Sequence, residues 1–228
     1  MKQQQGFTLV ELAIALMVIG LLIGGILKGQ ELIENTRIAR MMRDIENIDT
    51  AIMVFHSTYE DLPGDMKDPG RFLPDCTAPH CNQTETNAWY NNGQVDGNSG
   101  IERRNFWIHL NRANFLTMEI NENETSVYNV GPETPFGARY TFLYRDIADG
   151  IPLHRYEVST YVPDIFPCSR TAALDTKMDD GKPWSGMIQA YHTTTAGQNE
   201  CVNSANPTVY RSGSGLKGAP FITSKTAN

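Results

Sequence analysis

The first part of the sequence has almost no charge and no proline. Between Phe7 and Leu27, a stretch of 21 residues, the only ionisable side chain is Glu11, and no proline occurs before Pro63. A helix of this length is long enough to cross the ~30 Å hydrocarbon layer of a bilayer. The sequence therefore predicts a membrane segment over residues 7–27.

The chain also lacks the common catalytic motifs. Its five histidines show no His-Glu-x-x-His pairing, and no Gly-x-Ser-x-Gly or P-loop pattern is present. The formal net charge is -7, from 19 basic and 26 acidic residues, whereas a general nucleic-acid binder carries a basic face. We therefore expect neither an enzyme nor a protein that binds nucleic acid.

Glu11 is an unusual residue for a membrane segment. A carboxylate near the end of a lipid-facing helix costs on the order of 1 to 3 kcal/mol, so such residues usually have a partner and a function. No cation lies beside Glu11 within the segment. Cleavage between Gly6 and Phe7 would create an α-amino group four residues from Glu11, in its own chain or a neighbour's. The carboxylate would then have a positively charged partner.

The N-terminus resembles the prepilin family, which comprises type IV pilins and the pseudopilins of type II secretion systems. The resemblance rests on a short polar leader with Lys2, the residues Gly6-Phe7-Thr8-Leu9-Val10-Glu11, and the apolar segment that follows. It implies that prepilin peptidase cleaves after Gly6 and methylates the amine of Phe7. It also implies that Glu11 pairs with the N-terminus of another pilin or pseudopilin subunit during filament assembly.

Four cysteines, Cys76, Cys81, Cys168 and Cys201, all follow the membrane segment. Lys2 favours a cytoplasmic N-terminus, which places the head in the periplasm of a bacterium with this segment in its inner membrane. An even number of cysteines in an exported head indicates disulfides. Of the three pairings, Cys76–Cys81 with Cys168–Cys201 is favoured because sequence-local pairs close most easily. A zinc site with His80 beside Cys81 has only part of a ligand pattern.

We expect three regions: a leader over residues 1–6, a long helix over 7–59 and a globular head over 60–228. In the second half of the helix, apolar residues recur at spacings of three and four, which places them on one face that packs on the head. These residues are Ile38, Met41, Ile45, Ile48, Ile52, Phe55 and Tyr59, while Arg37, Arg40, Arg43, Glu46 and Asp49 are polar. Pro63 and Gly64 end the helix.

Within the head, the sequence predicts a short helix over 101–116 and two strands over 139–145 and 154–162, joined at the hairpin signal Asp149-Gly150. A second short helix is expected over 169–178 and a third strand over 186–191. Residues 65–100 are predicted to form a long surface loop, and 212–228 a flexible end. The predicted fold class is α+β, a long N-terminal helix packed on a small antiparallel sheet, similar to a pilin head.

Two groups of oxygen-bearing side chains are candidates for calcium, since Ca²⁺ prefers roughly six to eight oxygen ligands. One group is Asp96 and Asn98, and the other is Asp175, Asp179 and Asp180. Neither completes an EF-hand loop, and such residues also form ordinary turns. No other cofactor is expected.

The sequence leaves the role of the chain within this family open. Major pilins, minor pilins and pseudopilins share the same assembly mechanism, so a type IV pilus and a type II secretion system both fit. The alternative from another class is a membrane-anchored periplasmic binding protein or enzyme that does not polymerise. That alternative predicts an uncut N-terminus.

Overall fold

The computed structural model describes residues 8–77, 81, 91–95, 100–124, 126–145, 153–158, 166–190, 201–203, 206–210 and 220–224. The chain divides into two compact units, Met1–Ala39 and Arg40–Asn228, which we call the N-terminal unit and the head unit. The boundary between them lies inside helix α1, which extends from Leu9 to Tyr59. Residues 40–59 of this helix therefore belong to the head unit.

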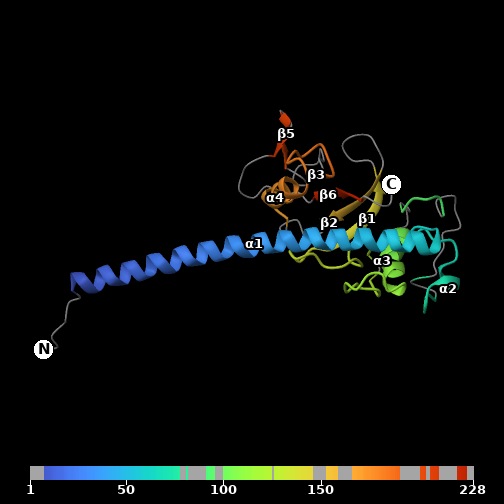
Figure 1. Cartoon of the computed structure of the whole chain (residues 1–228), viewed down its shortest axis with the longest axis horizontal. Helices are drawn as coiled ribbons and strands as arrows, with labels where there is room; N and C mark the ends of the chain where they lie inside the picture. Colours follow the sequence, from blue (N-terminus) through green and yellow to red (C-terminus); the bar gives the residue numbers. More distant parts are fainter. Residues whose placement is uncertain are drawn as a thin grey trace. The chain divides into compact units, whose positions relative to one another are not determined.

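Helix α1 is one unbroken helix of 51 residues (Figure 1). Among the residues that the structure describes, it is the one helix long and apolar enough to cross a membrane, by length and composition. The predicted helix over 7–59 is confirmed from Leu9 onward, and Phe7 lies outside the described residues. Its end at Tyr59 also agrees with the prediction: Glu60 adopts a left-handed φ of 60°, and Gly64, with a φ of 94°, turns the chain after Pro63.

Within the described residues, the head unit contains a four-stranded antiparallel sheet. Its strands, in spatial order, are β1 (Tyr140–Arg145), β2 (Leu153–Val158), β6 (Pro220–Thr223) and β3 (Ile188–Ala190). A separate two-stranded sheet pairs β4 (Val202–Asn203) with β5 (Asn206–Tyr210). The predicted α+β class is confirmed.

Three shorter helices complete the described elements of the head unit. They are α2 (Pro69–Phe72), α3 (Ile101–Arg112) and α4 (Cys168–Met178). Helix α3 ends before the predicted residue 116, because Asn114 adopts a left-handed φ of 57° and the N–H groups of Phe115 and Leu116 both bond to the Leu110 carbonyl. Helix α3 is therefore shorter than the periodicity predicts.

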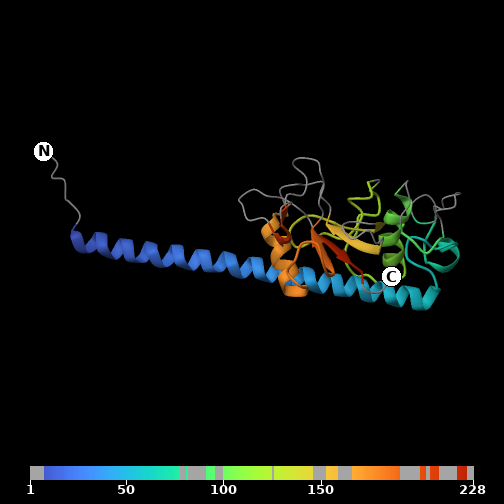
Figure 2. The same cartoon turned by 90° about the horizontal axis from the view of Figure 1, so that it is seen from above.

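The sheet lies beside residues 40–59 of α1 (Figures 1 and 2). The predicted apolar face of this part of the helix is buried, as its spacing indicated. Its buried residues are Met41, Ile45, Ile48, Ile52 and Phe55, each at most 2% exposed. The hydrophobic effect on this face holds the helix against the rest of the head unit.

Asp49 is also buried, which the apolar pattern did not indicate. Its Oδ1 atom accepts hydrogen bonds from the hydroxyls of Tyr156 in β2 and of Ser224 just after β6, both at 2.7 Å. Two hydroxyl donors offset the cost of removing this carboxylate from water. Asp49 thus joins α1 to strand β2 and to the residue after β6, a role that its polar character alone did not indicate.

Two predictions of exposed, irregular chain were wrong. The C-terminal residues Pro220–Thr223 form β6, which lies between β2 and β3, and Ser224 is buried. The predicted surface loop over 65–100 contains α2 and the buried residues Asp65, Met66 and Val95. In both cases the ordered elements, α2 and β6, have only four residues each, too few to show a period. Strand β6 is held by its pairing with β2 and β3.

Candidate functional site

Thr8 and Glu11 form a reciprocal set of hydrogen bonds at the start of α1. The Thr8 N–H and the Thr8 hydroxyl both donate to Glu11 Oε2 at 2.8 Å, and the Glu11 N–H lies 3.3 Å from Thr8 Oγ1. This is a capping box, in which a threonine and a glutamate three residues later satisfy free N–H groups of the first helical turn. Glu11 therefore has a neutral partner in its own chain. Thr8 is uncharged, so the need of Glu11 for a cation did not indicate it, although the Thr8-x-x-Glu11 spacing is present in the sequence.

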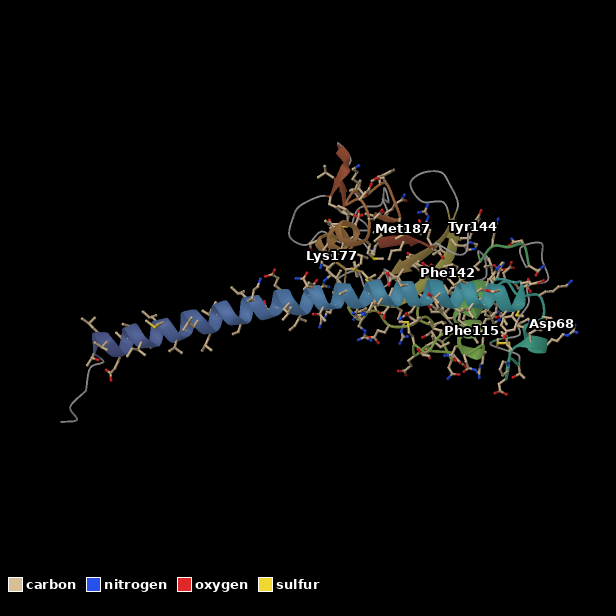
Figure 3. All side chains as sticks on the ribbon, viewed as in Figure 1. Asp68, Phe115, Phe142, Tyr144, Lys177 and Met187 are labelled. Carbon is tan, nitrogen blue, oxygen red and sulfur yellow. A yellow bond between two sulfur atoms is a disulfide. The ribbon has the colours of Figure 1, made fainter. Side chains whose placement is uncertain are left out.

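The apolar side chains that follow the capping box are exposed in the N-terminal unit. They stand away from the helix along its first part (Figure 3). The exposed large apolar residues from Leu9 to Ile33 are Leu9, Val10, Leu12, Ile14, Leu16, Met17, Val18, Ile19, Leu21, Leu22, Ile23, Ile26, Leu27, Leu32 and Ile33. A continuous apolar surface of this kind indicates burial in lipid or against other helices.

The head unit contains two disulfides with the pairing favoured from the sequence. Cys76 bonds to Cys81, and Cys168 bonds to Cys201. The second disulfide links the first residue of α4 to the residue before β4, and Cys168, Ala190, Cys201 and Val202 form a small buried cluster. His80, the residue considered for zinc, lies outside the described residues. Since Cys76 and Cys81 are bonded to each other, neither offers a thiolate to a metal.

His109 of α3 lies beside the first disulfide and is fully buried. Its Nδ1 atom accepts the Gly64 N–H at 3.0 Å, and its Nε2 atom lies 3.1 Å from the Cys81 carbonyl oxygen. The two contacts together require the neutral ring with its proton on Nε2. Burial lowers the pKa of His109 to about 4, although the Cys81 carbonyl opposes this shift. The histidine therefore joins the turn after α1 to the disulfide only while it is uncharged.

His109 makes a testable contribution to acid sensitivity. Because its folded-state pKa lies below its ordinary value of 6.5, its contribution to stability is complete above pH 6.5 and is lost as pH falls toward 4. At pH 4 we expect a loss of about 3 kcal/mol in the free energy of unfolding from this residue. His109→Asn, which keeps a hydrogen-bonding group but cannot titrate there, should not show that loss.

The measurement is urea unfolding of the full chain in detergent at pH 7 and pH 4 for both proteins. Asp65 and Asp175, whose pKa values are each raised to about 6 mainly by burial, respond to acid with the opposite sign. They are present in both proteins, so their effect cancels in the comparison. Equal losses of stability in the wild type and the variant would contradict the assignment.

The second candidate calcium group is brought together by the fold. Oxygen atoms of Asp175, Asp179 and Asp180 lie within 4.8 Å of one another. Asp175 accepts from the Gly181 N–H at 3.0 Å and the Tyr210 hydroxyl at 2.7 Å. These contacts join the end of α4 to its following turn and to β5. Burial, followed by the charges of the two neighbouring aspartates, raises the pKa of Asp175 to about 6.

The other two aspartates of this group also accept protein hydrogen bonds. Asp179 accepts the N–H groups of Met187 and Ile188, the latter at 2.8 Å. Asp180 accepts the Lys182 N–H at 2.9 Å and the Ser185 hydroxyl at 2.6 Å. The carboxylates thus organise the turn between α4 and β3 through protein hydrogen bonds, and calcium at this group stays a prediction. The first candidate group, Asp96 and Asn98, lies outside the described residues, as do Gly6 and Phe7.

Comparison with known proteins identifies the N-terminal segment. Residues 1–27 match the family model described as the prokaryotic N-terminal methylation motif. Among curated proteins, none matches the chain.

The solved structure of the major type IV pilin PilA1 from Clostridium difficile matches over 84% of this chain and 96% of its own, with 13% identity and a TM-score of 0.38. A TM-score of this size does not establish a shared fold. The chain is therefore a protein with the prokaryotic N-terminal methylation motif, in agreement with the resemblance of its first residues to type IV pilins and pseudopilins.

Proposed function

We propose that the chain is a structural subunit, a pilin, minor pilin or pseudopilin, of a type IV pilus or a type II secretion system. Prepilin peptidase cleaves it after Gly6 and methylates Phe7, and the first half of α1 then packs among other subunits in an envelope filament. The match of residues 1–27 to the methylation motif carries this proposal. Before assembly, the same helix spans the bacterial inner membrane with the head in the periplasm.

Glu11 has two successive partners in this proposal. In the precursor, the capping box with Thr8 satisfies the carboxylate by neutral hydrogen bonds. Cleavage makes Phe7 the first residue, so a charged amine arises one residue before the Thr8 nitrogen that already donates to Glu11. A charge-assisted hydrogen bond is stronger than a neutral one, especially where water is absent. The freed amine of this chain or a neighbour is therefore the better partner inside a filament.

The mass of the mature N-terminal peptide tests the processing step. We expect the protein purified from its host to begin at Phe7 and to carry a methyl group on that amine. A mature protein that still begins at Met1 would contradict the proposal and would favour a membrane-anchored binding protein or enzyme. The test does not depend on filament yield.

The amount of protein in sheared filaments tests the assembly step. Replacing Glu11 by alanine or glutamine should leave cleavage intact and lower incorporation at least about tenfold, which corresponds to ~1.4 kcal/mol of lost interaction. Glu11→Gln is the sharper variant because it keeps an acceptor for Thr8 and removes only the charge. Normal incorporation of both variants would exclude the proposed pairing.

A further inference from the structure

The sequence contains one Asn-Gly dipeptide, Asn92-Gly93, in an exposed turn of the head unit. Gly93 has a positive φ of 81°, and a Cβ placed on it would meet no atom within 4 Å. The turn is held from one side by Asp65, which is 2% exposed and follows the Pro63-Gly64 turn. The exposed asparagine is thus open to water, while the carboxylate beside it is not.

The Asp65 carboxylate accepts three successive backbone N–H groups of this turn. Its Oδ1 atom accepts the N–H of Asn91 and, at 3.3 Å, that of Asn92, and its Oδ2 atom accepts the Gly93 N–H at 2.7 Å. Within the turn, the Gln94 N–H donates to Asn92 Oδ1 at 2.8 Å. The Gly93 nitrogen therefore has a proton acceptor, and the Asn92 side-chain carbonyl has a hydrogen-bond donor.

We propose that Asn92-Gly93 is a site of self-modification, at which the folded chain promotes succinimide formation and deamidation of Asn92. The Gly93 nitrogen attacks the Cγ atom of Asn92 as its proton passes to Asp65. The Gln94 N–H stabilises the negative charge that develops on Oδ1 in the tetrahedral intermediate. The exposed side-chain nitrogen takes one proton from water and departs as ammonia, Asp65 returns its proton to water, and a five-membered succinimide remains.

Water completes the reaction by opening the succinimide ring. Attack at one carbonyl gives aspartate, and attack at the other gives isoaspartate, so the sum of the steps consumes one water and releases one ammonia. No oxidant, reductant or other co-reactant takes part. Glycine is the favourable second residue for such cyclisation because it has no side chain to hinder its nitrogen.

The position of Asp65 suits a general base. A base acts best within hydrogen-bond reach of the proton it removes and with a pKa near the working pH. Burial raises the pKa of Asp65 to about 6, the charge of Asp61 adds to the rise, and the three backbone donors oppose it. The carboxylate is thus more basic than an ordinary aspartate while remaining ionised at neutral pH.

The modification changes the turn that it occurs in. Both products carry a new carboxylate at position 92, the residue whose backbone N–H the Asp65 carboxylate accepts, and like charges repel. Isoaspartate also adds one methylene group to the backbone. We therefore expect the modified turn to lose its hydrogen bonds to Asp65 over time. The inference is independent of the proposed filament function.

The experiment compares the deamidation rate in the folded and unfolded full chain. The protein is incubated at neutral pH in detergent, with and without denaturing urea, and the peptide that contains Asn92 is assayed for aspartate and isoaspartate by mass spectrometry. We expect faster conversion in the folded chain than in urea. Folded conversion that is equal or slower would overturn the proposal, because the fold would then be protective. Asn114, which precedes Phe115, serves as the internal control and should stay unmodified.

The variant Asp65→Asn tests the role of the carboxylate. It keeps one carbonyl acceptor for the turn and removes the base, so folded-state conversion should fall at least about tenfold. An unchanged rate in a variant that folds would overturn the assignment of Asp65. If the variant fails to fold, the comparison of folded and unfolded wild type still decides whether the fold promotes the reaction.

Discussion

Replacing Gly64 by alanine is expected to lower the free energy of unfolding by more than about 4 kcal/mol, a loss at the upper end for single substitutions. Gly64 has a φ of 94°, and a Cβ there would lie 2.5 Å from the Glu102 carbonyl oxygen and 3.1 Å from the Phe106 nitrogen. Both atoms belong to the backbone of α3, so no side-chain movement relieves the contact. The substitution would separate the turn after α1 from α3 and disturb the hydrogen bond to His109.

Gly137→Ala is the matched control for this variant. Gly137 has a similar φ of 83°, but the atom nearest to a Cβ there is Glu133 Oε1 at 3.9 Å. Alanine at this position bears only the cost of the left-handed backbone, about 1 to 2 kcal/mol. Urea unfolding of the full chain, followed by the fluorescence of its tryptophans, measures both variants. Equal losses at the two positions would show that the contact with α3 is not the cause.

A chain that ends at Ala219 is expected to lose the cooperative fold of its head. This truncation removes β6, the strand that connects β2 to β3, and with it the fully buried Ile222. Loss of one such side chain alone costs about 2 to 5 kcal/mol. The truncation also leaves the backbone groups of both neighbouring strands without partners. Together, the lost side chain and the unpaired backbone groups cost an amount that approaches the roughly 5 to 15 kcal/mol that stabilises a whole domain.

Polar contacts add to this loss. Without residues 220–224, Asp49 loses the Ser224 hydroxyl, the His154 carbonyl loses the Ser224 N–H, and Arg155 loses the Thr223 hydroxyl at 2.8 Å. The control is a chain that ends at Ser224, which keeps all of these contacts and should retain a cooperative unfolding transition. A cooperative unfolding transition in the chain that ends at Ala219 would show that β6 is dispensable.

Local patterns in the sequence predicted much of the scaffold. The apolar run over residues 7–27 and the three- and four-residue spacing after it indicated α1, and Pro63 with Gly64 indicated its end. Alternation of aromatic and polar residues indicated β1 and β2. The disulfide pairing followed from short sequence separation, since Cys76 and Cys81 are 5 residues apart and Cys168 and Cys201 are 33 apart.

Sites formed by neighbouring residues could be predicted from the sequence, whereas sites formed by distant residues could not. The methylation motif is a run of adjacent residues, so residues 1–27 were recognised directly. The capping partner of Glu11 was equally local but carries no charge. Asp65 and Gly93 are 28 residues apart, and no period or spacing connects a single aspartate to a distant Asn-Gly pair.

The residues alone specified the long apolar helix, its amphipathic continuation and the N-terminal motif, because these depend on spacing along one continuous segment. Only the tertiary structure specified the burial of Asp49, the position of β6 between β2 and β3, and the environment of Asn92. Asp49 meets Tyr156 at a separation of 107 residues and Ser224 at 175. Contacts at such separations depend on how whole helices and strands pack. A given segment could pair with several others of similar composition, and only the packing of the whole core determines which pairing forms.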